Sequence, residues 1–130
     1  MDNFFIEKRI YYHDTDCEGV IYYANYLKHL EEARTEFCFK NGIDLKMFGQ
    51  EGIYFVVARV EIDYKATAEY GDKIKITARV EEVKRSSLVF YQEVKKVDLV
   101  LVKAKTIWVC VSSAFKPRSI PDEVKNILSG

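Results

Sequence analysis

The chain contains few of the residues that interrupt or cross-link a fold. Its 130 residues include two prolines, six glycines and three cysteines. So little proline and glycine leaves no room for a long flexible linker, and no internal repeat is present. The cysteines (Cys17, Cys38 and Cys110) are odd in number, widely spaced and form no CxxC pair, which argues against a disulfide framework. We therefore expect one domain over residues 1–130, with reduced thiols in the cytoplasm.

An excess of charge of either sign is also missing. Twenty basic residues balance twenty acidic ones, so no overall field attracts nucleic acid or anionic lipid. No apolar run approaches membrane-spanning length, and the N-terminus does not resemble a signal peptide. Two histidines without ligand spacing do not predict a zinc site. We expect a protein without nucleic-acid partner, membrane insertion, metal or cofactor.

A long amphipathic helix is expected over residues 24–41. Its apolar stripe comprises Tyr26, Leu27, Leu30, Ala33, Phe37 and Cys38. Gly42 follows as a natural C-terminal stop. Towards the polar side lie His29, which we expect to be solvated, and Glu31 and Glu32, for which a solvated helix face is a sufficient explanation.

Strands are expected on both sides of this helix, at residues 4–12, 53–63, 73–84, 88–96 and 99–112. Short connections between the later strands indicate antiparallel hairpins, and Pro121 suits the start of a short terminal helix. One helix about 10 Å across cannot cover five strands spaced about 4.8 Å apart. The uncovered face or edge therefore predicts a homo-oligomer.

Reactive side chains gather between the first strand and the helix. Within six residues the chain places His13, Asp14, Asp16, Cys17 and Glu18 just before a helix N-terminus. A helix N-terminus can polarise a carbonyl oxygen while a carboxylate directs a nucleophile at its carbon. For the two aspartates the alternative is a solvated turn or a helix cap. One acid suffices as a cap, which leaves at least one carboxylate without a structural task.

Two other interpretations of this segment are weaker. Its opening resembles an EF-hand calcium loop, but the twelfth position, which requires a bidentate glutamate, is Asn25. A thiol nucleophile at Cys17 is disfavoured because neighbouring Asp16 and Glu18 oppose the thiolate. Cys38 and Cys110 fit small core residues instead.

The residues from Tyr12 to Tyr26 resemble hotdog-fold acyl-CoA thioesterases of the 4-hydroxybenzoyl-CoA thioesterase type, and most of all the short bacterial enzymes associated with the Tol–Pal system. The matching motifs are Asp14-Thr15-Asp16, Gly19-Val20, Ala24-Asn25-Tyr26, Ala33-Arg34, Asp63-Tyr64, Gly71-Asp72 and Lys116-Pro117-Arg118. The resemblance covers nearly the whole chain. It implies an α+β hotdog fold, in which a five-stranded antiparallel sheet wraps around one long helix, with a short C-terminal helix.

The same resemblance implies roles for residues of the first motif. Asp16 corresponds to the catalytic carboxylate, as general base or as nucleophile, and the backbone N–H of Tyr23 to the oxyanion donor. Gly19, Val20 and Asn25 are implied to border the site. The reaction expected is hydrolysis of an acyl-CoA to a carboxylic acid and CoA, without metal or cofactor.

Substrate contacts are expected elsewhere in the chain. The CoA phosphates call for local cations and N–H donors, for which the candidates are Lys84, Arg85, Ser86, Ser87 and Arg118. In hotdog dimers the acyl pocket lies between protomers, which makes Phe55, Val56 and Tyr64 candidates from the partner chain. Exposed loops and ordinary strand cores are the competing explanations for these two groups.

The chain departs from the family pattern at two positions. Tyr23 stands where close relatives often carry histidine, and Thr67 stands where the family usually has proline. Neither change removes the central acid. Alternatives to the acyl-CoA hydrolase are a thioesterase acting on acyl carrier protein and a non-catalytic acyl-CoA-binding module of the same fold.

Overall fold

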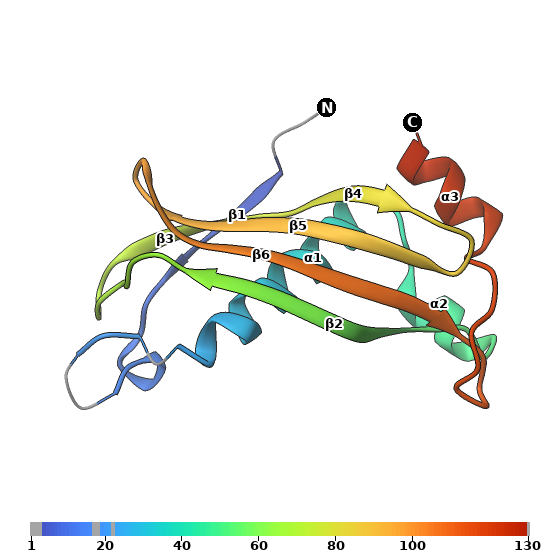
Figure 1. Cartoon of the computed structure of the whole chain (residues 1–130), viewed down its shortest axis with the longest axis horizontal. Helices are drawn as coiled ribbons and strands as arrows, with labels where there is room; N and C mark the ends of the chain where they lie inside the picture. The colour runs from blue at the N-terminus through green and yellow to red at the C-terminus, as the bar shows by residue number, and fades with distance from the viewer. Residues whose placement is uncertain (1–3, 17–18, 22, 130) are drawn as a thin grey trace.

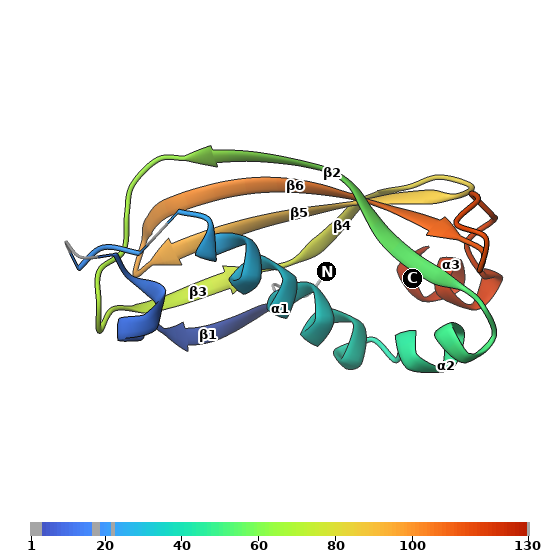
Figure 2. The same ribbon diagram turned by 90° about the horizontal axis from the view of Figure 1, so that it is seen from below.

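One antiparallel sheet wraps around a long helix in the computed structural model, which describes residues 4–16, 19–21 and 23–129 (Figures 1 and 2). The helix is α1 (Asn25–Lys40). The strands are β1 (Phe5–Arg9), β2 (Tyr54–Tyr64), β3 (Lys73–Thr77), β4 (Arg79–Val83), β5 (Ser87–Lys96) and β6 (Leu99–Val111). Their order in the sheet is β1-β3-β5-β6-β2, with β4 also paired to β5. Three short helical segments complete the chain: η1 (Tyr12–Asp14), α2 (Leu45–Gln50) and α3 (Asp122–Ser129).

This arrangement confirms the expected hotdog order, with one refinement in the sheet. The strand expected over residues 73–84 is interrupted at Ala78, so that β3 and β4 pair in turn with β5. At the interruption the side-chain hydroxyl of Thr77 accepts a hydrogen bond of 2.8 Å from the Glu93 N–H. A side chain thus replaces a ladder bond, which alternation of apolar residues does not reveal.

The C-terminal end of α1 is determined by local chemistry. Gly42 adopts a φ of +73°, a left-handed conformation that glycine adopts without steric cost, so the helix stops as expected. The loop that follows contains α2, which the sequence interpretation missed. Asp44 caps α2 by accepting a hydrogen bond of 3.0 Å from the Met47 N–H.

The prediction that His29 is solvated was wrong. Its side chain is fully buried, whereas Leu27, expected on the apolar stripe, is 45% exposed. A helical-wheel argument assumes one buried arc facing one layer. Here α1 contacts β1 as well as β3 and β5, and residues of β1 and η1 cover the side on which His29 lies.

Strand β2 forms one edge of the sheet. Within the described residues its only strand partner is β6. Several of its apolar or aromatic side chains are exposed, namely Tyr54, Val57, Val60 and Tyr64. An edge strand with exposed apolar side chains is suited to pairing with another chain.

Candidate active site

Between β1 and α1, the described residues 15–16 and 19–21 are joined by backbone contacts. Thr15 and Ile21 form an antiparallel bridge. Inside this bridge the Asp16 N–H donates to the Val20 carbonyl at 3.0 Å, and the Gly19 N–H donates to the Asp16 carbonyl at 3.2 Å. Gly19 has a φ of +83°, which explains why glycine stands there. Cys17 and Glu18 lie outside the described residues, so the calcium and thiol interpretations that use them gain no structural test.

Backbone hydrogen bonds attach this turn to the loop before β3. The Ile21 N–H donates to the Ala68 carbonyl at 2.9 Å, and the Tyr70 N–H donates to the Gly19 carbonyl at 2.9 Å. The Ala68 N–H in turn donates to the buried hydroxyl of Tyr26 on α1 at 3.1 Å. The turn that carries Asp16, Gly19 and Val20 is therefore fixed relative to the N-terminus of α1.

The two aspartates of the motif occupy different environments. The side chain of Asp14 is 1% exposed, and its Oδ2 accepts a hydrogen bond of 2.9 Å from the Tyr11 N–H. Asn25 donates from its side-chain amide to the Asp14 carbonyl at 2.9 Å, so Asn25 holds the turn to the helix. Asp16, in contrast, is exposed. Asp14 is therefore not part of a solvated turn, as one interpretation held, but a structural acid. The exposed carboxylate is that of Asp16.

Basic side chains face the buried carboxylate of Asp14. Its Oδ1 lies 3.3 Å from His29 Nε2 and 3.5 Å from Lys28 Nζ. Burial alone raises the pKa of Asp14. The Tyr11 hydrogen bond, then His29 and Lys28, outweigh burial and hold this pKa below its ordinary value. Asp14 is therefore ionised at neutral pH.

Tyr23 lies at the start of α1 with its ring exposed. This ring packs edge-to-face against that of Tyr64, with centroids 5.8 Å apart. The Tyr23 carbonyl accepts a hydrogen bond of 3.2 Å from the Tyr26 N–H, the first turn of the helix. The position therefore belongs to the helix N-terminus, where N–H groups and the helix dipole favour negative charge.

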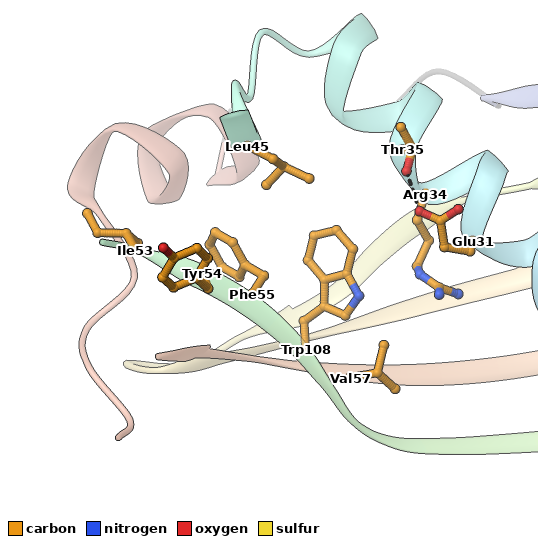
Figure 3. A pocket seen from close by; sticks show the side chains of 9 residues that line it. All are labelled: Glu31, Arg34, Thr35, Leu45, Ile53, Tyr54, Phe55, Val57 and Trp108. Atoms are coloured by element: carbon orange, nitrogen blue, oxygen red, sulfur yellow. Dashed lines mark hydrogen bonds between the residues drawn. The ribbon is translucent and has the colours of Figure 1, made fainter. Parts of the chain in front are cut away.

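A cavity of about 300 Å³ opens between α1 and the first half of β2 (Figure 3). Its lining residues are Glu31, Arg34, Thr35, Leu45, Ile53, Tyr54, Phe55, Val57 and Trp108. Trp108 and Phe55 form an aromatic wall, with centroids 5.5 Å apart. On the helix side the Thr35 hydroxyl donates to Glu31 at 2.6 Å. Among the predicted acyl-pocket residues Phe55 lines the cavity, whereas Val56 and Tyr64 do not.

Sequence reasoning missed most of this cavity. One signal was available, because Glu31, Arg34 and Thr35 recur at the i, i+3, i+4 spacing of one helix face. The other wall comes from β2 and β6, whose pairing places Val57 opposite Trp108. That register depends on the sheet as a whole, so no local sequence pattern identified the residues of the apolar wall.

The candidate phosphate-binding residues come together from distant parts of the chain. The Ile120 N–H donates to the Arg85 carbonyl at 2.8 Å, and the Cys110 N–H donates to the Ser86 carbonyl at 2.7 Å. The Arg118 N–H donates to the Cys110 carbonyl at 2.9 Å. We call Lys84, Arg85, Ser86, Ser87 and Arg118 the basic cluster. It lies beside α3, at the opposite end of the sheet from the Asp16 turn (Figure 2).

The two cysteines among the described residues are part of the core. Cys38 and Cys110 are buried, and burial raises the pKa of the Cys38 thiol to about 12, so it is not a nucleophile at neutral pH. Among residues 4–16, 19–21 and 23–129 no group of three His, Cys, Asp or Glu side chains is arranged to hold a metal ion. In the same ranges no helix has the length and apolar character needed to cross a membrane.

Comparisons with known proteins agree with this fold. The family model described as "Thioesterase-like superfamily" matches residues 11–128. The acyl-CoA thioesterase YbgC of Haemophilus influenzae is 37% identical over 96% of this chain and 94% of its own length. A hypothetical protein of Aquifex aeolicus has a crystal structure that superimposes with a TM-score of 0.90 at 30% identity, over 96% of this chain and 98% of its own.

A third comparison extends the likeness in fold alone. A 1,4-dihydroxy-2-naphthoyl-CoA thioesterase from Synechocystis superimposes with a TM-score of 0.90 at 21% identity, over 98% of this chain and 96% of its own. The match of the family model over almost the entire chain, the 37% identity to a curated relative and the shared sheet-and-helix arrangement lead to one conclusion. The chain belongs to the thioesterase-like superfamily and has the hotdog fold.

Proposed function

We propose that this protein hydrolyses acyl-CoA thioesters to a carboxylic acid and free CoA. Its superfamily acts on thioesters, and its relative from Haemophilus influenzae is named an acyl-CoA thioesterase. The observation that carries the proposal is the exposed carboxylate of Asp16, on a turn held by backbone hydrogen bonds beside the N-terminus of α1. That arrangement offers an acid to a substrate carbonyl and a positive helix end to its oxygen.

Asp16 acts in this proposal as general base or as nucleophile. As a base it removes a proton from water as the water oxygen attacks the thioester carbon; the carbon–sulfur bond breaks and the thiolate takes up a proton. As a nucleophile its carboxylate attacks the thioester carbon and the carbon–sulfur bond breaks, which gives a mixed anhydride and a CoA thiolate that takes up a proton. Water then hydrolyses the anhydride to the free carboxylic acid and regenerates Asp16. In both cases the carbonyl oxygen gains negative charge near the Tyr23 N–H. One such preorganised donor lowers the barrier by about 3 kcal/mol.

In this proposal the complete site is assembled from two chains. Asp16 lies near the Tyr64 end of β2, whereas the part of β2 that lines the cavity is Tyr54–Val57. From Val57 to Tyr64 there are seven residue steps of about 3.3 Å, or roughly 23 Å, so the acid and the strand wall of the cavity lie toward opposite ends of β2. Antiparallel pairing of two β2 edges around a twofold axis brings the Tyr64 end of one chain to the Tyr54 end of the other. Asp16 then faces the cavity of the partner subunit.

The basic cluster completes the substrate site at the same end as the cavity. Arg85 and Lys84 are exposed there, and Arg118 is half-buried beside them. Guanidinium groups and backbone N–H groups bind phosphate oxygens well, which suits the nucleotide part of CoA. The acyl part then enters the apolar cavity beside Phe55 and Trp108. The thioester lies between the bound nucleotide and the bound acyl group, near Asp16 of the second chain.

A panel of short, long and aromatic acyl-CoAs tests this proposal. Purified protein is assayed for release of free thiol, with the same acyl groups on acyl carrier protein as competing substrates. We expect hydrolysis of at least one acyl-CoA class and weaker competition by the carrier-protein form. Binding of acyl-CoA without thiol release would instead indicate a non-catalytic binding module. Preferred hydrolysis of the carrier-protein form would reassign the substrate.

A further inference from the structure

The most unusual internal feature outside the substrate cavity is a chain of charged and polar groups around His29. The ring is fully buried on α1. On one side, Nδ1 lies 3.0 Å from Lys8 Nζ, and Lys8 also forms an ion pair with Glu32. On the other side, Nε2 lies 3.3 Å from Asp14 Oδ1. The ring therefore connects β1 to η1 through the helix.

The contact with Lys8 determines which ring nitrogen carries the proton. Two groups face Nδ1: Lys8 Nζ at 3.0 Å and Glu32 Oε1 at 3.5 Å. The ammonium is the nearer one and has donors but no acceptor, so we assign Nδ1 as the acceptor from Lys8. The neutral ring then carries its proton on Nε2, the atom that faces Asp14. Burial and the Lys8 charge lower the pKa of His29, against the opposing effects of Asp14 and Glu32, so the ring is neutral at pH 7.

The facing atoms of this pair make no hydrogen bond to a third group in the described residues. Within the described residues, Asp14 Oδ1 and His29 Nε2 are both buried and neither has a hydrogen-bond partner. A buried carboxylate oxygen and a buried ring N–H that face each other at 3.3 Å are complementary in charge and in donor and acceptor. The other basic side chains near Asp14 Oδ1 are Lys28 at 3.5 Å and His13 at 3.7 Å, both exposed.

We propose that Asp14 and His29 form a buried latch that positions the Asp16 turn for catalysis. This inference rests on the proposed function, in which Asp16 is the reacting acid. The latch acts through the backbone: Asp14 binds the Tyr11 N–H through its carboxylate and the Asn25 amide through its carbonyl. Asp16 follows two residues later in the same turn, so a shift of Asp14 relative to α1 displaces Asp16 relative to the helix N-terminus.

The latch predicts a specific kinetic signature. His29→Leu removes the Nε2 donor, whereas in His29→Gln the side-chain amide supplies a donor at a similar position. With both variants folded at 25 °C, we expect His29→Leu to lower kcat by roughly 10- to 100-fold with little change in KM. His29→Gln is expected to recover most of kcat. His13→Gln, which changes the exposed histidine beside Asp14, is the matched control and should behave as wild type.

A measurement independent of activity accompanies the kinetics. Nitrogen-detected NMR of the wild-type imidazoles at pH 7 is expected to show one ring protonated on Nε2 and not on Nδ1, a signal that disappears in His29→Gln. The latch is refuted by the opposite tautomer or by wild-type kcat in folded His29→Leu. It is also refuted if His29→Gln is as impaired as His29→Leu. If the wild-type protein releases no thiol from any acyl-CoA, the proposed function is refuted but the Asp14–His29 contact is not, because the NMR measurement tests that contact separately.

Discussion

The hydroxyl of Tyr64, near the end of β2, donates to the carbonyl of Tyr23 at the start of α1 across 3.4 Å. Their rings also pack edge-to-face. This contact connects the end of the exposed edge strand to the segment that precedes the helix. It places the Asp16 turn at one end of β2, while the cavity and the basic cluster lie at the other. In the proposed function, the Asp16 turn of one chain and the cavity and basic cluster of a second chain form one active site.

Mixed oligomers test this two-chain arrangement. Asp16→Asn removes the acid, and the double variant Arg85→Ala/Arg118→Ala weakens the basic cluster. Each is expected to form a poorly active oligomer alone. Co-refolding equal amounts should restore activity, because in a mixed dimer one site combines the intact acid of one chain with the intact cluster of the other. Random pairing makes about a quarter of all sites intact. Thiol release at an acyl-CoA concentration well below the wild-type KM measures the recovery, because the defect of the double variant is expected in KM.

The control for this experiment is a mixture of Asp16→Asn with wild-type protein at the same ratio. If the acid and the basic cluster served the same active site within one chain, every chain of the first mixture would carry a defect in its own site. No activity above the sum of the two separate variants would then appear. Such a result would remove the two-chain site from the account.

The basic cluster makes a separate prediction about substrate recognition. Arg85→Ala/Arg118→Ala is expected to raise KM for an acyl-CoA roughly tenfold or more, because guanidinium contacts to phosphate are lost. For the corresponding acyl thioester of pantetheine, which lacks the nucleotide, KM should stay near that of wild type. Arg79→Ala is the matched control, since Arg79 on β4 is exposed and its guanidinium lies over the ring of Tyr91 on β5. Equal effects of the double variant on both substrates would contradict phosphate binding.

His29 predicts the pH dependence of stability. Burial, then Lys8, lower its pKa in the folded state below the ordinary value of 6.5. The unfolded chain therefore binds a proton that the folded chain does not, and the free energy of unfolding decreases as pH falls below about 6.5. The lowered pKa of Asp14 decreases the free energy of unfolding further only at lower pH, where its carboxylate becomes protonated. Urea unfolding between about pH 7.5 and 5 should show a smaller decrease in His29→Gln than in wild type.

Parallel curves for the wild type and His29→Gln would show that His29 keeps its ordinary pKa in the folded protein. His13→Gln serves as the control, because that side chain is exposed and 3.7 Å from Asp14 Oδ1. Its unfolding curve is expected to follow the wild type at every pH.

Gln92 is predicted to be a major contributor to stability. It is fully buried on β5, donates to the Leu30 carbonyl at 2.9 Å, and accepts from the buried guanidinium of Arg34 at 2.9 Å. Gln92→Leu leaves a buried carbonyl and a buried cation short of a partner, at a cost of about 3 kcal/mol. Thermal unfolding measures this loss. Gln50→Leu, at an exposed site on α2, should change stability by less than about 0.5 kcal/mol. Equal midpoints for the two variants would contradict the assignment.

Local patterns predicted the elements of this fold well, because each follows from nearby residues. The period of α1 and the left-handed Gly42 delimited the helix, and alternation located the later strands. The first strand ends at Arg9, earlier than the alternation indicated, because the Tyr11 N–H bonds to Asp14 and starts a 3₁₀ turn. The interruption at Ala78 likewise depends on a contact from another strand.

The sequence motif of the candidate site could be predicted, but the distant residues that contact it could not. The acidic turn marked Asp16, but the burial of Asp14 depends on His29 and Lys28, which enter the neighbourhood only when α1 folds against the turn. The grouping of Arg85 with Arg118 depends on β5 and β6 lying side by side. Relations of this kind join residues far apart in the sequence and have no periodic signal.

The most direct test of the central claim is the steady-state hydrolysis of an active acyl-CoA by Asp16→Asn. The fold, the oligomeric state and acyl-CoA binding should match the wild type, whereas kcat should fall by roughly a thousandfold or more, since an acid essential to proton transfer or covalent attack is lost. Turnover near that of the wild type would contradict the account and assign the chemistry to another carboxylate.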